Sequence, residues 1–290
     1  LYSNKRRPSP EDIRDVDVLV FDIQDVGTRF YTYISSLQEF LECALENHKP
    51  LIILDRPNPN GFYVDGPVLD LRFKSFVGMQ PIPIAYGMTM AEYALMMLGE
   101  KWLSEKANAA HAYNLTTQPT PDTPFHIQII KCQNYTHNSK YVLPVKPSPN
   151  LPDMQSVYLY PTTCLFEGTA LSEGRGTDKP FQYIGHPDLP TTMFAFTPNP
   201  NAGSKSSKHF GKICYGWNFG GTVEEVLKKT NGKIQIQWLI DAYNLFPKKD
   251  SFFLKSGSFN RLAGNDVLIQ QIKEGKTEKE IRESWEPALT

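Results

Sequence analysis

The 290-residue sequence has no excess of either charge. It contains 30 basic and 31 acidic residues, which gives a formal net charge of −1. Proteins that bind nucleic acid usually gather basic residues on one face, so the composition argues against a nucleic-acid partner. No run approaches the roughly 18 apolar residues that a membrane-spanning helix needs. Residues 1–7 are polar and basic and do not resemble a signal peptide, so a signal for export would lie outside these residues.

The motifs of several enzyme classes are also missing. The four cysteines lie far apart without a CxxC pair, which argues against a metal site or a dense disulfide framework. Cys43 and Cys164 lie in apolar patterns and are predicted to be buried thiols. The six histidines show no metal-binding spacing. The phosphate-binding loop, the GxGxxG fingerprint and the GxSxG elbow are absent. These absences argue against a zinc enzyme, a nucleotide-dependent Rossmann enzyme and a serine hydrolase, and no cofactor or metal is expected.

Aromatic residues, in contrast, are frequent. They make up 12% of the chain, with 14 Tyr and 17 Phe. Tyr and Trp suit a sugar-binding cleft because the flat ring covers a sugar face while the polar edge bonds to hydroxyl groups. A well-filled hydrophobic core explains the same composition more simply, so the count leaves both readings open.

The first half of the chain shows the pattern of a βαβ unit. Residues 16–22 and 50–55 are short apolar runs, typical of strands buried on both faces of a parallel sheet. Residues 33–47 between them show helical periodicity. A strand, helix and strand within about forty residues predict parallel strands joined by a right-handed crossover. Further elements are expected as strands at 81–86 and 125–131, a helix at 90–103 and a loop at 116–124.

Four prolines between residues 144 and 152 mark a change in composition. We therefore place a domain boundary near Leu143, with a Rossmann-like parallel-sheet domain at 1–143 and a smaller α/β domain at 144–290. No βα unit precedes the first strand, which predicts that the parallel sheet is truncated at its N-terminal end. The second half is expected to hold strands at 155–160 and 212–217, and helices at 222–230, 234–244 and from 277 onward.

Polar residues follow both strands of the βαβ unit. In open parallel sheets, ligands bind beyond the carboxyl ends of the strands. Asp22 and Asp55 could instead cap turns and pair with Arg29 or Arg56, which is a purely structural reading. Glu92 follows the expected strand at 81–86, but residues 89–92 also form a capping box. The candidates in the two loops are Asp22, Gln24, Asp25, Arg29 and Tyr31, and then Asp55, Arg56, Asn58 and Asn60.

The densest polar segment is residues 166–177. It contains Glu167, Glu173 and Arg175 together with three glycines, which permit unusual backbone conformations and close approach of a ligand. A glycine-rich loop alone is weak evidence. The two carboxylates and the guanidinium within nine residues favour a ligand-binding role.

Taken together, these segments resemble the NamZ-like exo-β-N-acetylmuramidases, a family long catalogued as a domain of unknown function. The resemblance covers the whole chain, and residues 158–161 look like the Bacteroidetes-type branch. It implies a Rossmann-like domain followed by a smaller α/β domain, with the active cleft between them. It also implies release of N-acetylmuramic acid (MurNAc) from the non-reducing end of MurNAc–GlcNAc saccharides of peptidoglycan, without a cofactor. Periplasmic or secreted localisation, often as a lipoprotein, is implied as well. The matching stretches are 18–33, 54–59, 86–89, 147–150, 166–169 and 174–177.

The sequence departs from the family pattern in one motif. Family members carry a Glu-His-Gly segment expected to supply a catalytic carboxylate, and these 290 residues contain none. Glycoside hydrolysis usually needs two carboxyl groups, so we expect Asp25, or alternatively Glu167, to be the partner of that glutamate. A non-catalytic module that binds muropeptides is the alternative to an enzyme. The expected substrate contacts are Arg56 or Arg175 with the lactyl carboxylate, Asn58 and Asn150 with hydroxyls or the acetamide, Tyr31 with the ring face, and Asp22, Arg29 and Glu173 around them.

Overall fold

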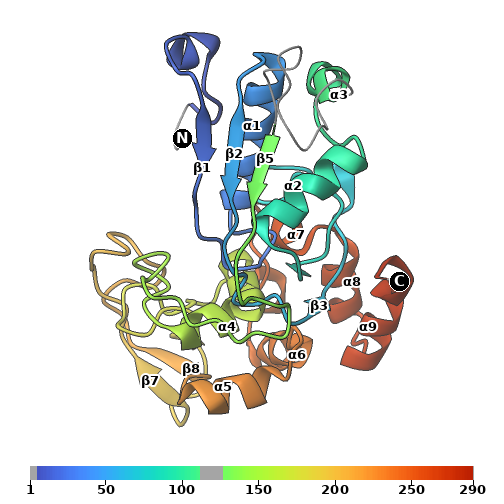
Figure 1. The fold of residues 1–290 in the computed structure, drawn as a ribbon. Helices are drawn as coiled ribbons and strands as arrows, with labels where there is room; N and C mark the ends of the chain where they lie inside the picture. The colour runs from blue at the N-terminus through green and yellow to red at the C-terminus, as the bar shows by residue number, and fades with distance from the viewer. Residues whose placement is uncertain (1–4, 112–126, 290) are drawn as a thin grey trace.

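The computed structural model describes residues 5–111 and 127–289. Its first half is built on a parallel sheet with the strand order β1-β2-β5, where β1 is Leu19–Phe21, β2 is Leu51–Leu54 and β5 is Ile127–Ile130. Helix α1 (Tyr33–Glu46) joins β1 to β2, which confirms the predicted βαβ unit. Figure 1 shows this sheet in the upper part of the molecule, with the loops that leave β1 and β2 running toward the second half. The predicted loop at 116–124 and the first residues of the predicted strand at 125–131 lie outside the described residues.

The sheet is covered on one face rather than on both. Leu19, Phe21, Leu51 and Ile53 are buried in one hydrophobic core with side chains of helices α1, α2 (Met90–Gly99) and α3 (Glu105–His111). The alternate residues face away from this core, and Val20 is 50% exposed. The prediction of strands buried on both faces was therefore wrong. All three helices join the core on the same side, so the other side carries no described helix.

Two other predicted strands take different forms. Within residues 81–86 only Ala85–Tyr86 forms a strand, β4, and it pairs antiparallel with β3 (Val64–Asp65) instead of joining the parallel sheet. Pro81 and Pro83 lack the backbone N–H that a longer ladder would use.

Residues 155–160 lie in helix α4 (Met154–Thr163), not in a strand. The Asp153 carboxylate starts this helix by accepting a hydrogen bond from the Ser156 N–H at 2.9 Å. Nearly the whole helix is buried, so its sequence lacks the polar face that would have shown helical periodicity.

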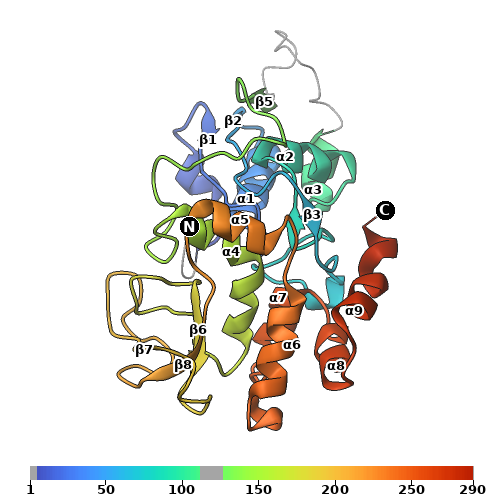
Figure 2. The same cartoon turned by 90° about the horizontal axis from the view of Figure 1, so that it is seen from below.

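The second half combines an antiparallel sheet with a group of helices. The sheet has the order β6-β8-β7, where β6 is Tyr183–His186, β7 is Phe194–Phe196 and β8 is Cys214–Asn218. The predicted strand at 212–217 and the predicted helices are confirmed by β8, α5, α6 and α9. Figure 2 shows α6, α7, α8 and α9 grouped together, with α4 between them and this sheet. The helices are α5 (Val223–Thr230), α6 (Ile236–Leu245), α7 (Ser258–Ala263), α8 (Val267–Lys273) and α9 (Glu278–Trp285), and the short 3₁₀ helices are η1 (Pro10–Ile13), η2 (Leu71–Phe73), η3 (Cys164–Gly168), η4 (Lys249–Ser251) and η5 (Glu286–Ala288).

A second hydrophobic core lies under α4, α6 and α7 and also takes in Val26, Phe30 and Ile84 from the first half. The loops that leave the parallel sheet are therefore packed into the second half of the chain. The domain boundary near Leu143 stays a prediction. Cys43 and Cys164 are buried free thiols, as predicted.

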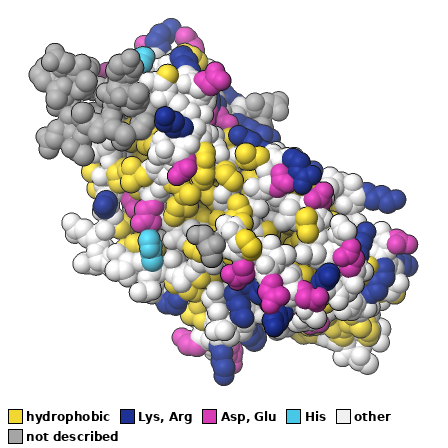
Figure 3. Space-filling model, turned by 90° about the vertical axis from the view of Figure 1, so that its right-hand side faces the viewer, with side chains coloured by type: hydrophobic (Ala, Val, Ile, Leu, Met, Phe, Trp, Pro, Cys, Tyr) yellow, Lys and Arg dark blue, Asp and Glu magenta, His cyan; other side chains and the backbone are white. Residues whose placement is uncertain are grey.

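The surface agrees with the balanced composition. On the face in Figure 3, basic and acidic side chains are interspersed, and neither sign forms a continuous patch. Among the described residues, no helix combines the length and the apolar composition that crossing a membrane would require.

Candidate active site at the seam between the two halves

The loop after β1 buries a carboxyl group. Asp25 is 3% exposed, and its Oδ2 accepts hydrogen bonds from the Gly27 N–H at 2.6 Å and from the Tyr86 hydroxyl at 2.5 Å. Oδ1 is buried and has no hydrogen-bond partner among the described residues. Burial raises the pKa of Asp25 to about 7, although both hydrogen bonds favour the charged form. The group can thus hold or release a proton near neutral pH.

The loop after β2 packs directly against the loop after β1. The Asn60 side-chain amide donates to the Val26 carbonyl at 2.8 Å, and Asn58 Nδ2 donates to the Met88 carbonyl at 2.8 Å. Gly27 has φ +78°, and a Cβ there would lie 2.1 Å from Asn58 Oδ1. Only glycine fits both this backbone conformation and this close approach. The two loops therefore converge, as expected from the parallel sheet. The side chains of Asn58 and Asn60 form hydrogen bonds within the protein at this point.

A cavity opens where the two loops meet the proline-rich segment. Arg56 Nε lies 2.6 Å from Asp22 Oδ1, and both side chains are about 40% exposed. The pair lines a cavity of about 280 Å³ together with Gln24, Pro144 and Val145. Asp22 therefore pairs with Arg56 and not with Arg29. Among the described residues, no partner is found for the two terminal nitrogens of Arg56, which leaves them open to a ligand anion.

The structure places Arg29 in the interior, contrary to its expected contact with substrate. The side chain is fully buried, and its terminal nitrogens donate to the carbonyls of Pro67, Ile82 and Leu262 at 2.7–2.9 Å. Burial lowers the pKa of Arg29 to about 9. Leu262 belongs to α7, so this arginine joins the first half to the second. Arg29 lies close to Asp25 in the sequence, but the sequence alone could not show that the backbone turns the Arg29 side chain inward.

Tyr31 and Asn150 connect the seam to the proline-rich segment. The Tyr31 hydroxyl donates to the Pro147 carbonyl at 2.9 Å, and the Tyr31 ring meets the ring of Tyr160 on α4 edge-on, with centroids 5.9 Å apart. The Asn150 side-chain amide donates to the Gly203 carbonyl at 2.7 Å. Residues 144–150 are thus held between the first loop and the second half.

The glycine-rich segment forms a charge cluster behind Tyr160. Arg175 binds Glu167 at 2.6 Å and Glu173 at 3.3 Å, and Lys208 binds Glu173 at 3.1 Å. Burial raises the pKa of Glu167, while Arg175 opposes the shift. The Tyr160 ring contacts Phe181, over which the Arg175 guanidinium lies. The rings of Tyr160 and Phe181 therefore lie between Arg175 and Tyr31 of the first loop.

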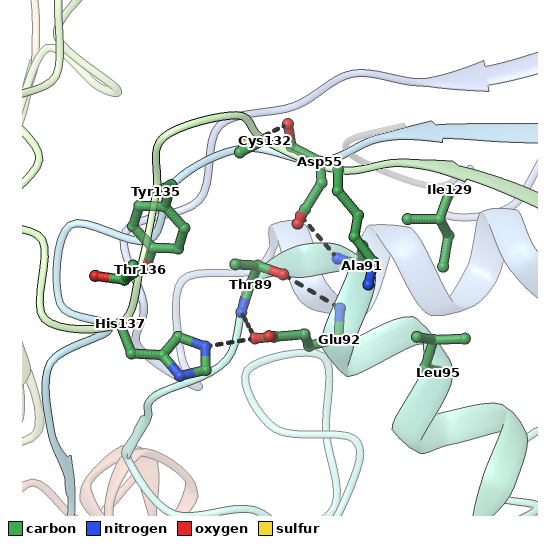
Figure 4. Close-up of a pocket in the computed structure, with 11 residues that line it drawn as sticks. Asp55, Thr89, Ala91, Glu92, Leu95, Ile129, Cys132, Tyr135, Thr136 and His137 are labelled. Carbon is green, nitrogen blue, oxygen red and sulfur yellow. Dashed lines mark hydrogen bonds and ion pairs between the residues drawn. The ribbon is translucent and has the colours of Figure 1, made fainter.

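Sequence reasoning missed a further cavity at the carboxyl ends of β2 and β5. It has a volume of about 330 Å³, and Figure 4 shows its lining residues. Asp55 Oδ1 accepts from the Ala91 N–H of α2 at 3.0 Å, and Glu92 completes the predicted capping box with Thr89. His137 Nε2 lies 2.8 Å from Glu92 Oε2. His137 and Tyr135 follow β5 without any motif, so only the fold brings them here.

The clusters described above do not form a metal centre. Within the described residues, no group of three or more His, Cys, Asp or Glu side chains is arranged to hold a metal ion. The structure brings Asp22, Asp25, Arg56, Asn58 and Tyr31 to one seam, with Asn150 beside them. It sets Glu167, Glu173 and Arg175 one aromatic layer away.

Comparison with known proteins identifies the family. The family model described as "Exo-beta-N-acetylmuramidase NamZ, N-terminal" matches residues 1–155, and "Exo-beta-N-acetylmuramidase NamZ, C-terminal" matches residues 158–290. The chain is 36% identical, over 305 aligned positions, to the peptidoglycan β-N-acetylmuramidase NamZ of Bacillus subtilis, and the match covers all of this chain and 68% of that protein.

Two solved structures from Bacteroides fragilis share the fold. A DUF1343 family protein, BF0379, is 43% identical with a TM-score of 0.84, and the match covers 97% of this chain and 74% of that one. A second DUF1343 protein, BF0371, shows likeness of fold at 24% identity, with a TM-score of 0.78 over 99% of this chain and 75% of that one. The chain therefore belongs to the NamZ exo-β-N-acetylmuramidase family, whose members are glycosidases that act on peptidoglycan.

Proposed function

We propose that this chain releases a terminal MurNAc from the non-reducing end of peptidoglycan fragments. The observation that carries the proposal is the buried carboxyl group of Asp25, whose pKa is raised to about 7 at the point where the loops after β1 and β2 converge. A carboxyl group that keeps its proton near neutral pH is suited to protonate the oxygen of a leaving sugar. Family membership supports the same class of reaction.

The second carboxyl group of the reaction is assigned to the glutamate of the Glu-His-Gly motif, which these 290 residues do not contain. Within the chain, Glu167 is the alternative. Its raised pKa supports a proton-transfer role. Its ion pair with Arg175 and its position behind Tyr160 favour a supporting role instead.

The lactyl carboxylate distinguishes MurNAc from GlcNAc, and we assign it to Arg56. The guanidinium of Arg175 already binds two carboxylates, whereas Arg56 binds one and lines an open cavity. A planar guanidinium can bind a second carboxylate through its terminal nitrogens. The side-chain amides of Asn58 and Asn150 donate to backbone carbonyls, so we assign these two residues to holding the loops in position. Tyr31 stays the candidate for contact with the sugar ring.

The proposed substrate also supports a proposal for where the protein works. Peptidoglycan lies outside the cytoplasmic membrane, so we propose that the protein acts in the periplasm or as a secreted protein or lipoprotein.

A chromogenic β-MurNAc glycoside tests the assignment. A protein that carries the Glu-His-Gly segment together with these 290 residues should release the chromophore, and Arg56→Ala should raise its KM. On the disaccharide MurNAc-β-1,4-GlcNAc, whose leaving sugar needs a proton, Asp25→Asn should lose at least about a hundredfold in kcat because its proton donor is gone. A matched chromogenic GlcNAc glycoside should bind more weakly, and Arg56→Ala should not affect it. Wild-type rates for both variants would remove these two assignments.

A non-catalytic module that binds MurNAc is the second candidate, since the open cavity beside Arg56 accounts for binding without bond cleavage. Titration with MurNAc beside the release assay separates the two when the protein carries the Glu-His-Gly segment. Saturable binding without any released chromophore would establish the module and overturn the enzyme.

A further inference from the structure

An open groove lies on the second half of the chain, outside the seam that holds Asp25. It has a volume of about 470 Å³ and runs between the end of the glycine-rich segment, the start of β6 and the end of β7. The residues that line it are Gly176, Thr177, Asp178, Tyr183, Phe196, Thr197, Asn199 and Asn201.

One wall of the groove is aromatic. The half-buried Tyr183 ring packs against Phe194 and Phe196 with centroids 4.8 and 5.5 Å apart. The two phenylalanines fix the tyrosine ring, so its exposed part offers a rigid flat surface. Within the described part of the chain, no partner is found for the Tyr183 hydroxyl, which therefore remains available to a ligand. A fixed ring with a free polar edge suits the apolar face and the hydroxyl groups of a sugar.

The opposite wall is polar but carries no positive charge. Asn201 is used by the protein itself, since its Nδ2 donates to the Thr177 carbonyl at 3.0 Å and its Oδ1 accepts from the Gly203 N–H at 3.0 Å. Asn199 and Asp178 are exposed at the rim, and Asn199 Nδ2 donates to the Thr197 carbonyl at 3.3 Å. No lysine or arginine is among the lining residues, all of which the structure describes. A phosphate or carboxylate would find no counter-ion there, so the groove favours a neutral ligand rich in hydroxyl and amide groups.

The groove is joined to the seam by the proline-rich segment. Pro144 and Val145 line the Arg56 cavity at one end of this segment, and at its other end Asn150 bonds to Gly203, beside Asn201. Figure 1 shows the loops of this segment and those around β7 together at the lower left, below β1. The two cavities are thus linked along the chain by residues 144–150.

We infer that this groove binds a neutral N-acetylglucosamine (GlcNAc) unit of the same glycan chain whose terminal MurNAc occupies the seam. The inference rests on the proposed function for the order of the sugars. The acidic sugar meets the arginine of the seam, and the neutral sugar meets the aromatic and amide walls. The groove then determines preference for glycan length and takes no part in bond cleavage.

Kinetics on a short and a long substrate test the groove. For Tyr183→Ala we expect KM on a MurNAc-terminated glycan to rise about five- to tenfold, as expected for the loss of one aromatic contact. Its kcat on the glycan, and both constants on the chromogenic MurNAc glycoside, should stay unchanged. Tyr183→Phe should keep most of the affinity. Phe210→Ala is the matched control because Phe210 is 54% exposed and lies outside the lining.

Direct binding separates a failure of the groove from a failure of the proposed function. Isothermal titration with a neutral tetrasaccharide of GlcNAc should show binding by the wild type that Tyr183→Ala and the rim variant Asn199→Ala weaken and Phe210→Ala does not. If the protein shows that result but releases no MurNAc, the groove is supported as a sugar-binding site and the proposed enzyme activity is refuted. No binding of the tetrasaccharide, or equal binding by all variants, would overturn the groove even if MurNAc is released.

Discussion

Replacement of Asp25 by asparagine should change how the stability of the protein depends on pH. Burial raises the pKa of this carboxyl from 3.8 to about 7, so the folded protein keeps a proton that the unfolded chain releases. Because the folded pKa is the higher one, the stability linked to this proton is fully present below about pH 4 and is lost as pH rises through about 7. A shift of about three units corresponds to about 4 kcal/mol in total at 1.36 kcal/mol per unit. The amide in Asp25→Asn cannot ionise, so this variant should lose none of this stability as pH rises.

Urea unfolding followed by tryptophan fluorescence at pH 5, 6, 7 and 8 measures the effect. Between pH 5 and pH 8, the free energy of unfolding of the wild type should fall by about 3 kcal/mol more than that of Asp25→Asn. The comparison cancels the other titrating groups, since both proteins share them. Two curves that stay parallel over this range would show that the Asp25 carboxyl is ionised throughout, and the argument for a neutral proton donor would fail.

Three further substitutions test the packing of the seam. Tyr86→Phe removes a hydrogen bond to the ionised Asp25 and should move the pH dependence of unfolding to higher pH; an unchanged midpoint would contradict this. Gly27→Ala should destabilise the protein by about 1 kcal/mol more than Gly275→Ala, because both have positive φ but only Gly27 faces a close side chain; equal melting temperatures would refute the close approach. Arg29→Met should cost about 3–5 kcal/mol in urea unfolding, since three buried carbonyls lose their donor, and a loss below about 1 kcal/mol would show that these bonds contribute little.

The sequence predicted the elements that depend on local patterns. The βαβ unit, the capping box at Thr89 and the buried thiols of Cys43 and Cys164 are all found in the structure. Each follows from spacing or hydrophobicity within a few neighbouring residues. Helix α4 was mistaken for a strand because nearly all of its side chains are buried, and burial by the rest of the fold erases the polar face that periodicity needs.

The candidate site was predicted at the level of segments. The rule for parallel sheets brought the loops of Asp22 and Arg56 together correctly. The state of Asp25 depends on Tyr86, 61 residues away, and the interior position of Arg29 depends on carbonyls as distant as Leu262. Partners this far apart in the sequence cannot be predicted from local sequence patterns. The contacts of Tyr183 were likewise not predictable, since they require β6 and β7 to be paired with β8.

Two isomeric disaccharides test the central claim most directly. Together with the Glu-His-Gly segment, the chain should convert MurNAc-β-1,4-GlcNAc into free MurNAc and GlcNAc in equal amounts, measured by mass spectrometry. It should leave GlcNAc-β-1,4-MurNAc intact, because that isomer presents no carboxylate to Arg56 at its non-reducing end. Cleavage of both isomers, or of neither, would contradict a site built to release a terminal acidic sugar.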